Sequence, residues 1–304
     1  MSEGPDALEH YGATKQGGLT MSARVAGRVV AITGGASGFG AATARLLVAE
    51  GARVVLGDIQ DDKGTAVATG LGEMAVFRHC DVTSEDDIAA LVDTAVSTYG
   101  RLDGMVNNAG IVGAVGPIDE TPLAEYEFTM AVLLRSVFLG MKHAARVMKP
   151  QGSGSIVSIS SVAGIQGGLG PHVYATAKTA VIGLTRNIAA ELGAFGIRVN
   201  AISPGKHATP MNANLVAGDP DDIDRTLEYM RTVSPLRDRP GTADDIAHAI
   251  LWLVSDDAGF VTGHTLVVDG GLTIGAPENP GKRTPSRWSS HAPLVREAGK
   301  QGID

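Results

Sequence analysis

Short apolar runs alternate with amphipathic stretches of helical spacing along most of the chain. Runs rich in Val, Ile and Leu are typical of buried strands, and the stretches between them repeat with the period of a helix. Strands are expected at residues 29–32, 53–56, 74–78, 104–106, 155–158, 198–202 and 266–268. Helices are expected at residues 41–49, through the 60s, and at 86–98, 123–148 and 173–192. This alternation predicts βαβ units, and therefore one doubly wound α/β domain with a seven-stranded parallel sheet and helices on both faces.

The two ends of the chain lack this pattern. Residues 1–24 are polar and glycine-rich, and we expect them to form an extension to a domain that spans residues 25–272. Residues 273–304 form a tail whose prolines preclude a long helix. Because the tail carries Trp288 and an apolar Leu-Val pair, we expect it to pack on a neighbouring subunit, the alternative being a disordered end.

The periodicity also lapses inside the domain, from about residue 205 to residue 240. Long segments without a clear pattern in a compact domain are often functional loops. Two interpretations remain open for this segment, a mobile lid over a site and a structural insertion.

Composition narrows the class of protein. An apolar fraction of 44% with 19% charged residues is that of an ordinary globular protein with a sizeable core. The net charge of −8 and the absence of basic clusters argue against a nucleic-acid partner. No apolar run reaches the roughly 18 residues of a membrane span, and the N-terminus does not resemble a signal peptide. Because Cys80 is the only cysteine, we expect no disulfides and a reducing, cytoplasmic location. We also expect no membrane partner and no metal site.

A glycine-rich segment follows the first predicted strand and opens the first helix. It contains Gly34, Ser37, Gly38, Phe39 and Gly40. Glycines there let the backbone turn sharply and approach a pyrophosphate, which the free N–H groups and the dipole of the helix N-terminus stabilise. The strand–turn–helix context makes this motif a prediction of dinucleotide binding.

Acidic residues at the next two strand ends specify the expected cofactor. Asp58, at the end of the second strand, is placed to accept both ribose hydroxyls of NAD and to repel the 2′-phosphate of NADP. The following residue, Ile59, offers no cation for a phosphate. Asp81 and Val82 close the third strand, where a contact with adenine and a helix cap are both open. NAD is therefore the predicted cofactor.

A second constellation carries the chemistry. Tyr174 and Lys178 are four residues apart on a predicted helix, so the phenol and the ammonium share one face. A nearby ammonium favours the phenolate, and we expect it to lower the pKa of the phenol from about 10. Ser161, just past the fifth strand, is expected to hydrogen-bond the substrate oxygen.

With these motifs in this order, the chain resembles the NAD(P)-dependent short-chain dehydrogenase/reductase family from about residue 25 to residue 272. The resemblance implies a Rossmann fold and a homodimer or homotetramer. It also implies that Tyr174 is the general acid or base, that Lys178 lowers its pKa and holds the nicotinamide ribose, and that Ser161 orients the substrate. Further cofactor contacts are implied at Asn108, Ala109, Gly110, Pro204, Gly205 and Thr209.

Two positions depart from the family pattern. Leu133 stands where the family usually has an asparagine that anchors a proton-relay water. His207 replaces a branched apolar residue, and we expect it to face solvent, the alternative being contact with substrate. For His172, near the edge of the expected site, substrate contact and ordering of the loop are both open.

The predicted function is an NAD-dependent oxidoreductase that interconverts a hydrophobic, cyclic secondary alcohol and its ketone. The stretch 167–172 is similar to plant short-chain dehydrogenases of cyclic terpenoid or lignan alcohols. An apolar mouth is expected from Ile111, Val112, Val115, Ile165, Leu169 and Met211. The alternatives are an NADPH-dependent 3-oxoacyl-carrier-protein reductase, which Asp58 argues against, and a non-catalytic NAD-binding sensor or scaffold, for which Leu133 is the support.

Overall fold

A seven-stranded parallel sheet forms the centre of the protein in the computed structural model, which describes residues 23–275. The predicted extension and tail lie outside these residues except at their inner ends. The strand order is β3-β2-β1-β4-β5-β6-β9, and every pair in it is parallel. The strands are β1 (Val29–Thr33), β2 (Arg53–Asp58), β3 (Ala75–His79), β4 (Gly104–Asn107), β5 (Gly154–Ile159), β6 (Ile197–Pro204) and β9 (Thr265–Val268). The predicted doubly wound fold is confirmed.

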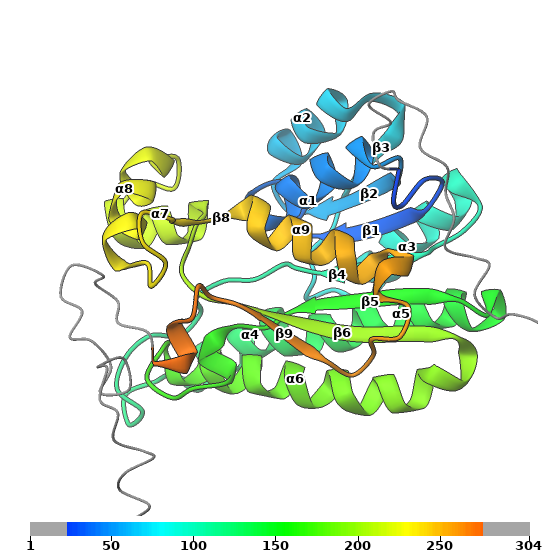
Figure 1. Ribbon diagram of the computed structural model, residues 1–304. Coiled ribbons are helices and arrows are strands. Elements are labelled where there is room, and N and C mark those ends of the chain that lie inside the picture. The colour runs from blue at the N-terminus through cyan, green and yellow to red at the C-terminus, as the bar shows by residue number, and fades with distance from the viewer. Residues whose placement is uncertain (1–22, 276–304) are drawn as a thin grey trace, which may run out of the picture.

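Helices cover both faces of this sheet (Figure 1). One layer consists of α1 (Gly38–Ala49), α2 (Asp61–Leu71) and α9 (Ala243–Val254). The opposite layer consists of α3 (Glu85–Tyr99), α4 (Leu123–Met130), α5 (Ser136–Gln151) and α6 (His172–Leu192). No helix within residues 23–275 is both long enough and apolar enough to cross a membrane.

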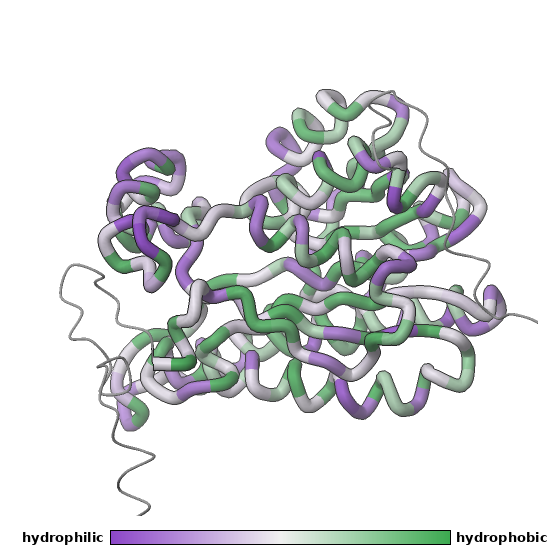
Figure 2. The backbone as a smooth tube through the Cα atoms, in the orientation of Figure 1, coloured by the Kyte–Doolittle hydropathy of each residue, from purple (hydrophilic) through white to green (hydrophobic). Residues whose placement is uncertain are grey.

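Two apolar clusters hold the layers to the sheet. Ile88, Leu91 and Met141 belong to the cluster under α3, α5 and α6, and Leu47 and Ile250 belong to the cluster under α1 and α9. Figure 2 shows the strands as a mostly apolar band through the middle of the molecule. A sheet buried on both faces needs apolar residues at consecutive positions, which is why its strands read as continuous Val/Ile/Leu runs rather than alternating ones.

The structure corrects several predicted boundaries. Met74 lies in a short 3-10 turn, and β3 begins one residue later. The single helix predicted for residues 123–148 is interrupted by a π-helical turn at Ala131–Arg135. Residues 243–254, for which no helix was expected, form α9 and cover much of one sheet face.

The segment from residue 205 to residue 240 is not irregular. After the short strand β7 (His207–Ala208) it forms α7 (Pro210–Ala217) and α8 (Ile223–Val233), and it ends where β8 (Gly241–Thr242) pairs with β7. Both helices stand apart from the two layers (Figure 1). The sequence of this segment shows no clear periodicity because its two helices are short and a polar loop joins them.

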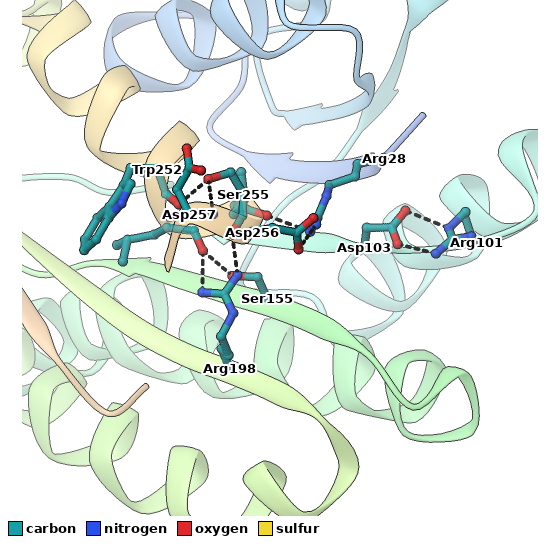
Figure 3. Close-up of polar contacts among 11 residues, drawn as sticks. Arg28, Arg101, Asp103, Ser155, Arg198, Trp252, Ser255, Asp256 and Asp257 are labelled. Atoms are coloured by element: carbon teal, nitrogen blue, oxygen red, sulfur yellow. Dashed lines mark hydrogen bonds and ion pairs between the residues drawn. The ribbon is translucent and has the colours of Figure 1, made fainter. Parts of the chain in front are cut away.

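Arginines fasten the end of α9 to the amino ends of the strands (Figure 3). Arg198 of β6 donates to the carbonyl oxygens of Leu253 at 2.7 Å and of Ser255 at 3.0 Å. Arg28 donates to the carbonyl oxygen of Val254 at 2.8 Å and pairs with Asp256. Cations at a helix C-terminus satisfy its unpaired carbonyls and oppose the negative end of its dipole.

We expect Arg198→Ala to lower the free energy of unfolding by about 1–3 kcal/mol, because two carbonyls at the end of α9 lose a charged donor. Urea denaturation followed by circular dichroism measures the change. Arg186→Ala removes an exposed arginine from α6 and is the matched control. Equal stability of the two variants would show that the Arg198 contacts contribute nothing.

Candidate active site

A cavity of about 600 Å³ opens at the carboxyl ends of the strands, beside the point where the strand order reverses between β1 and β4. It is lined by Gly34, Ser37, Gly38, Phe39, Asp58, Ile59, Asp81, Val82, Asn108, Ala109, Gly110, Ser161, Tyr174, Lys178, Pro204, Gly205 and Thr209. The structure thus brings together every predicted site residue except Gly40.

The glycine-rich loop after β1 is fastened to the loop after β4. The Asn108 side-chain amide donates to the carbonyl oxygens of Thr33 at 2.9 Å and Gly34 at 3.0 Å. Gly34 has a φ of +67°, and a Cβ there would lie 2.9 Å from the Cα of Ala109. Only glycine allows both this backbone conformation and this approach.

The N-terminus of α1 fits a phosphate group. Its N-cap residue, Ser37, makes no side-chain capping hydrogen bond, so the first N–H groups of the helix have no such partner. Gly38, with a φ of +50°, lines the cavity at that point. Gly40 is turned inward instead, where a Cβ would lie 2.0 Å from the Gly34 carbonyl oxygen. Gly40 therefore has a packing role that brings the helix against the loop, and its cofactor contact stays a prediction.

Asp58 is 7% exposed at the end of β2, and its carboxylate organises the adjoining loops. One oxygen accepts the N–H of Ala36 at 3.0 Å, and the other accepts the N–H of Gln60 at 3.0 Å. The Gln60 side-chain amide also donates to the second oxygen, at 3.4 Å. Of the about four acceptor sites of a carboxylate one is then left for a ribose hydroxyl, and displacing the long Gln60 side-chain contact would free another. The residues present therefore fit a dinucleotide with an unphosphorylated ribose.

Asp81 closes β3 with a local turn rather than a cap. Its carboxylate accepts the N–H and the hydroxyl of Thr83, each at 2.8 Å. The N-cap of α3 is Ser84, whose hydroxyl accepts the N–H of Asp87. Asp81 and Val82 still line the cavity, so the contact with adenine stays a prediction while the capping role belongs to Ser84.

Ser161, Tyr174 and Lys178 meet on the opposite side of the cavity. The Tyr174 hydroxyl is hydrogen-bonded to Ser161. The Lys178 ammonium donates to the carbonyl oxygen of Ile159 at 2.8 Å and lies 5.6 Å from the centre of the Tyr174 ring. Ser160 also lines the cavity, but its hydroxyl already donates to the Lys178 carbonyl oxygen at 2.8 Å. This difference supports Ser161 as the serine that faces the site.

Burial dominates the acid–base behaviour of this cluster. The pKa of the Tyr174 phenol lies above its ordinary value, because burial raises it and the bond to Ser161 lowers it by less. Burial also lowers the pKa of Lys178 from 10.5 to about 8. The structure thus corrects the expectation that the ammonium lowers the pKa of the phenol, because burial is the largest influence on that pKa and raises it.

Leu133 lies within the π-helical turn and is fully buried. A Cβ on Gly110 would lie 3.4 Å from Leu133 Cδ2 and 3.9 Å from Lys178 Nζ. The leucine therefore presents apolar surface in the region of the lysine and offers no hydrogen bond there. That this position takes no part in a proton relay stays a prediction.

The structure decides between the alternatives for His172 and His207 in different ways. His172 begins α6 and lies 3.3 Å from the hydroxyl of Thr121, which in turn donates to the Pro117 carbonyl oxygen. This contact favours the loop-ordering role. His207 is only 3% exposed, so the expectation that it faces solvent is wrong.

Apolar side chains form the outer part of the cavity. Ile111, Val112, Leu169 and Met211 line it as predicted. Val115 and Ile165 do not, and they are 73% and 46% exposed. The cavity is also lined by four apolar residues that were not predicted there, Phe128, Val132, Leu215 and Leu272. The spacing of Phe128 and Val132, four residues apart on a helix, was the signal that would have found that pair.

The chain is similar along most of its length to several known proteins. Residues 34–273 match the family model described as enoyl-(acyl carrier protein) reductase. The chain is 45% identical to xanthoxin dehydrogenase of Arabidopsis thaliana, over 83% of this chain and 92% of that protein. It is 47% identical to the mitochondrial borneol dehydrogenase of Lavandula x intermedia, over 84% and 94%. The crystal structure of levodione reductase superposes with a TM-score of 0.75 at 39% identity, over 82% of this chain and 99% of that one.

The depressed pKa of Lys178 predicts a pH-dependent stability. Between about pH 8 and pH 10.5 the unfolded chain binds a proton that the folded chain lacks, so the free energy of unfolding rises with pH there. Lys178→Met removes this contribution. We expect the stability of the variant relative to wild type to be highest at pH 7 and to fall by about 3 kcal/mol by pH 10. Denaturant unfolding at a series of pH values measures the difference, and one that does not change with pH contradicts the assignment.

Proposed function

From the premise that this chain belongs to the short-chain dehydrogenase/reductase family, we propose that it uses NAD to interconvert a hydrophobic, cyclic secondary alcohol and its ketone. The observation that carries the proposal is the grouping of Ser161, Tyr174 and Lys178 in one cavity with the glycine-rich loop and Asp58. Family membership makes the chain an oxidoreductase that acts on alcohols with a nicotinamide cofactor. The choice of NAD, the residue roles and the substrate class are the proposal.

The reaction exchanges a proton and a hydride with the substrate. In the oxidation direction the Tyr174 oxygen takes the hydroxyl proton, while the hydride leaves the carbon. Ser161 donates a hydrogen bond to the substrate oxygen and holds it within reach of the phenol. When bound, oxidised NAD supplies the hydride acceptor and a positive ring charge that favours the phenolate. The Lys178 ammonium, which donates to the Ile159 carbonyl oxygen, holds a cation over the Tyr174 ring.

The cavity walls support a hydrophobic substrate. Phe128, Val132, Leu169 and Leu215 come from three segments and line the same cavity as Tyr174 with apolar surface. A polyhydroxylated sugar would lose its hydrogen bonds to water against such walls, whereas a cyclic hydrocarbon frame would bury its surface. The printed names of the borneol and levodione enzymes are consistent with this class.

We propose that the enzyme is active although Leu133 replaces the asparagine that the family usually has at this position. The three donors of the Lys178 ammonium include one already bound to Ile159, and a water can accept another. This argument favours an enzyme over the non-catalytic sensor. The NADPH-dependent reductase remains disfavoured because the buried Asp58 carboxylate would oppose a phosphate.

A homodimer or homotetramer is proposed to form through the outer faces of α5 and α6. Leu134, Phe138 and Leu184 border a shallow apolar hollow there, and Phe138 is 47% exposed. A second copy of the chain related by a twofold axis would bury the same surface on both subunits. We also propose a cytoplasmic location, because Cys80 is a buried free thiol and a reducing compartment preserves free thiols.

Asp58 is expected to make the enzyme prefer NAD. Two anions in this partly desolvated site repel each other by about 3 kcal/mol, which corresponds to a preference on the order of a hundredfold in kcat/KM. Asp58→Asn should narrow the ratio, since it removes the charge and keeps one acceptor oxygen. Asp62→Asn, an exposed neighbour on α2, is the control for net charge. Equal kcat/KM with the two cofactors in the wild type would refute the assignment.

Tyr174→Phe is expected to lower kcat by about 10²–10⁴-fold, because it removes the proton acceptor and keeps the ring. Binding of NAD, measured by calorimetry, should stay close to that of the wild type. Tyr126→Phe changes a tyrosine that is 41% exposed on α4 and should leave kcat unaltered. Near-normal turnover of Tyr174→Phe would mean that another group moves the proton.

A further inference from the structure

The part of the 205–240 segment that follows β7, residues 209–240, is called the lid segment below. Both of its ends are held at the β7–β8 pair. It leaves the body of the protein after β7 and returns at β8, and these two strands pair in parallel, His207 with Gly241 and Ala208 with Thr242. In Figure 1 the α7–α8 unit is joined to the rest of the molecule at this pair. Met211 and Leu215 of α7 line the cavity, so the position of the lid segment shapes the site.

His207 occupies the centre of this joint. Its Nδ1 lies 3.2 Å from the Gly205 carbonyl oxygen, and its own carbonyl oxygen accepts the Asn212 side-chain amide at 2.7 Å. The ring lies against the backbone of Gly241, where a Cβ would approach ring atom Cδ2 to 2.9 Å. One residue therefore contacts the segment before the lid, the first helix of the lid and the strand that follows it.

The same ring reaches the glycine-rich loop. Phe39, in the first turn of α1, meets His207 edge to face, with the ring centres 5.6 Å apart and the planes at 85°. Phe39 lines the cavity beside Gly38. Next to this contact, a Cβ on Gly38 would lie 3.6 Å from Pro210, the first residue of α7. The loop and the base of the lid segment are thus packed directly on each other.

Its surroundings favour the neutral form of the His207 imidazole, because the pKa of the ring is lowered from its ordinary value. Burial lowers its pKa, the bond to Gly205 raises it, and among charged groups Asp245 and Asp269 raise it and Arg239 lowers it, burial having the largest effect. A carbonyl oxygen only accepts, so Nδ1 carries the hydrogen. The orientation of the ring is then set by one hydrogen bond on one side and by Phe39 on the other.

We propose that His207 is a positioning residue that couples occupation of the glycine-rich loop by NAD to ordering of the lid segment. The inference rests on the proposed use of NAD. A cofactor on the loop restricts Phe39, the restricted ring holds His207, and His207 holds both ends of the lid segment together. Coupling of this kind is reciprocal, so closing the lid segment must also tighten NAD binding.

Limited proteolysis with trypsin tests the coupling without relying on turnover. The lid segment offers cleavage sites after Arg225, Arg231 and Arg237, which can be followed by mass spectrometry. In the wild type, saturating NAD should slow these cleavages by about fivefold or more. In His207→Ala the protection should fall below about twofold, and the Kd of NAD should rise about threefold to tenfold. His248→Ala, an exposed histidine on α9, should behave as the wild type.

Phe39→Leu probes the same contact from the other side and keeps an apolar side chain in place, so it serves if His207→Ala does not fold. Protection by NAD should be lost to a similar extent, and the double variant should bind NAD no more weakly than the worse single variant. Additive losses in Kd, or full protection in His207→Ala, would overturn the coupling while leaving the proposed function intact. Failure of the wild type to bind NAD in calorimetry would instead overturn both.

Discussion

The close approach of two loops at the reversal of strand order is the constraint on which the site depends. The loop after β1 and the loop after β4 touch backbone to backbone, and the Asn108 amide joins them through two carbonyl oxygens. If they moved apart, the N-terminus of α1 would no longer face Tyr174 and Lys178 across one cavity. A side chain larger than hydrogen at Gly34 or Gly40 would force that separation.

Burial then sets the chemistry of the opposite wall. Lys178 is 4% exposed and has one carbonyl partner, which brings its pKa to within about one unit of neutrality. Tyr174 is shifted the other way by the same desolvation. A site of this kind is costly to the fold, since an ammonium buried beside apolar Leu133 lowers stability at neutral pH. Such costs are found where function requires a charge inside the protein.

The outer part of the site is assembled from elements that are far apart in sequence. Phe128 comes from α4, Leu215 from α7 and Leu272 from the turn that follows β9. The turn after β9 is held by Asp269, whose carboxylate accepts N–H groups of Gly271 and Thr273 and the Thr273 hydroxyl. The outer part of the cavity therefore depends on how the lid segment and this turn are anchored, whereas its inner part depends on the sheet.

The sequence by itself determined the strands, the parallel sheet and the inner site, because these follow from local patterns. Continuous apolar runs mark strands buried on both faces, and Gly34, Tyr174 and Lys178 belong to motifs that gain their meaning from following one another in a fixed order along the chain. Tertiary structure alone decided the rest. His207 reads as a solvent-facing polar residue until Phe39 and Gly241, both far away in the chain, bury it. Burial and desolvation are sums over neighbours that only the folded chain brings together, and no local pattern contains them.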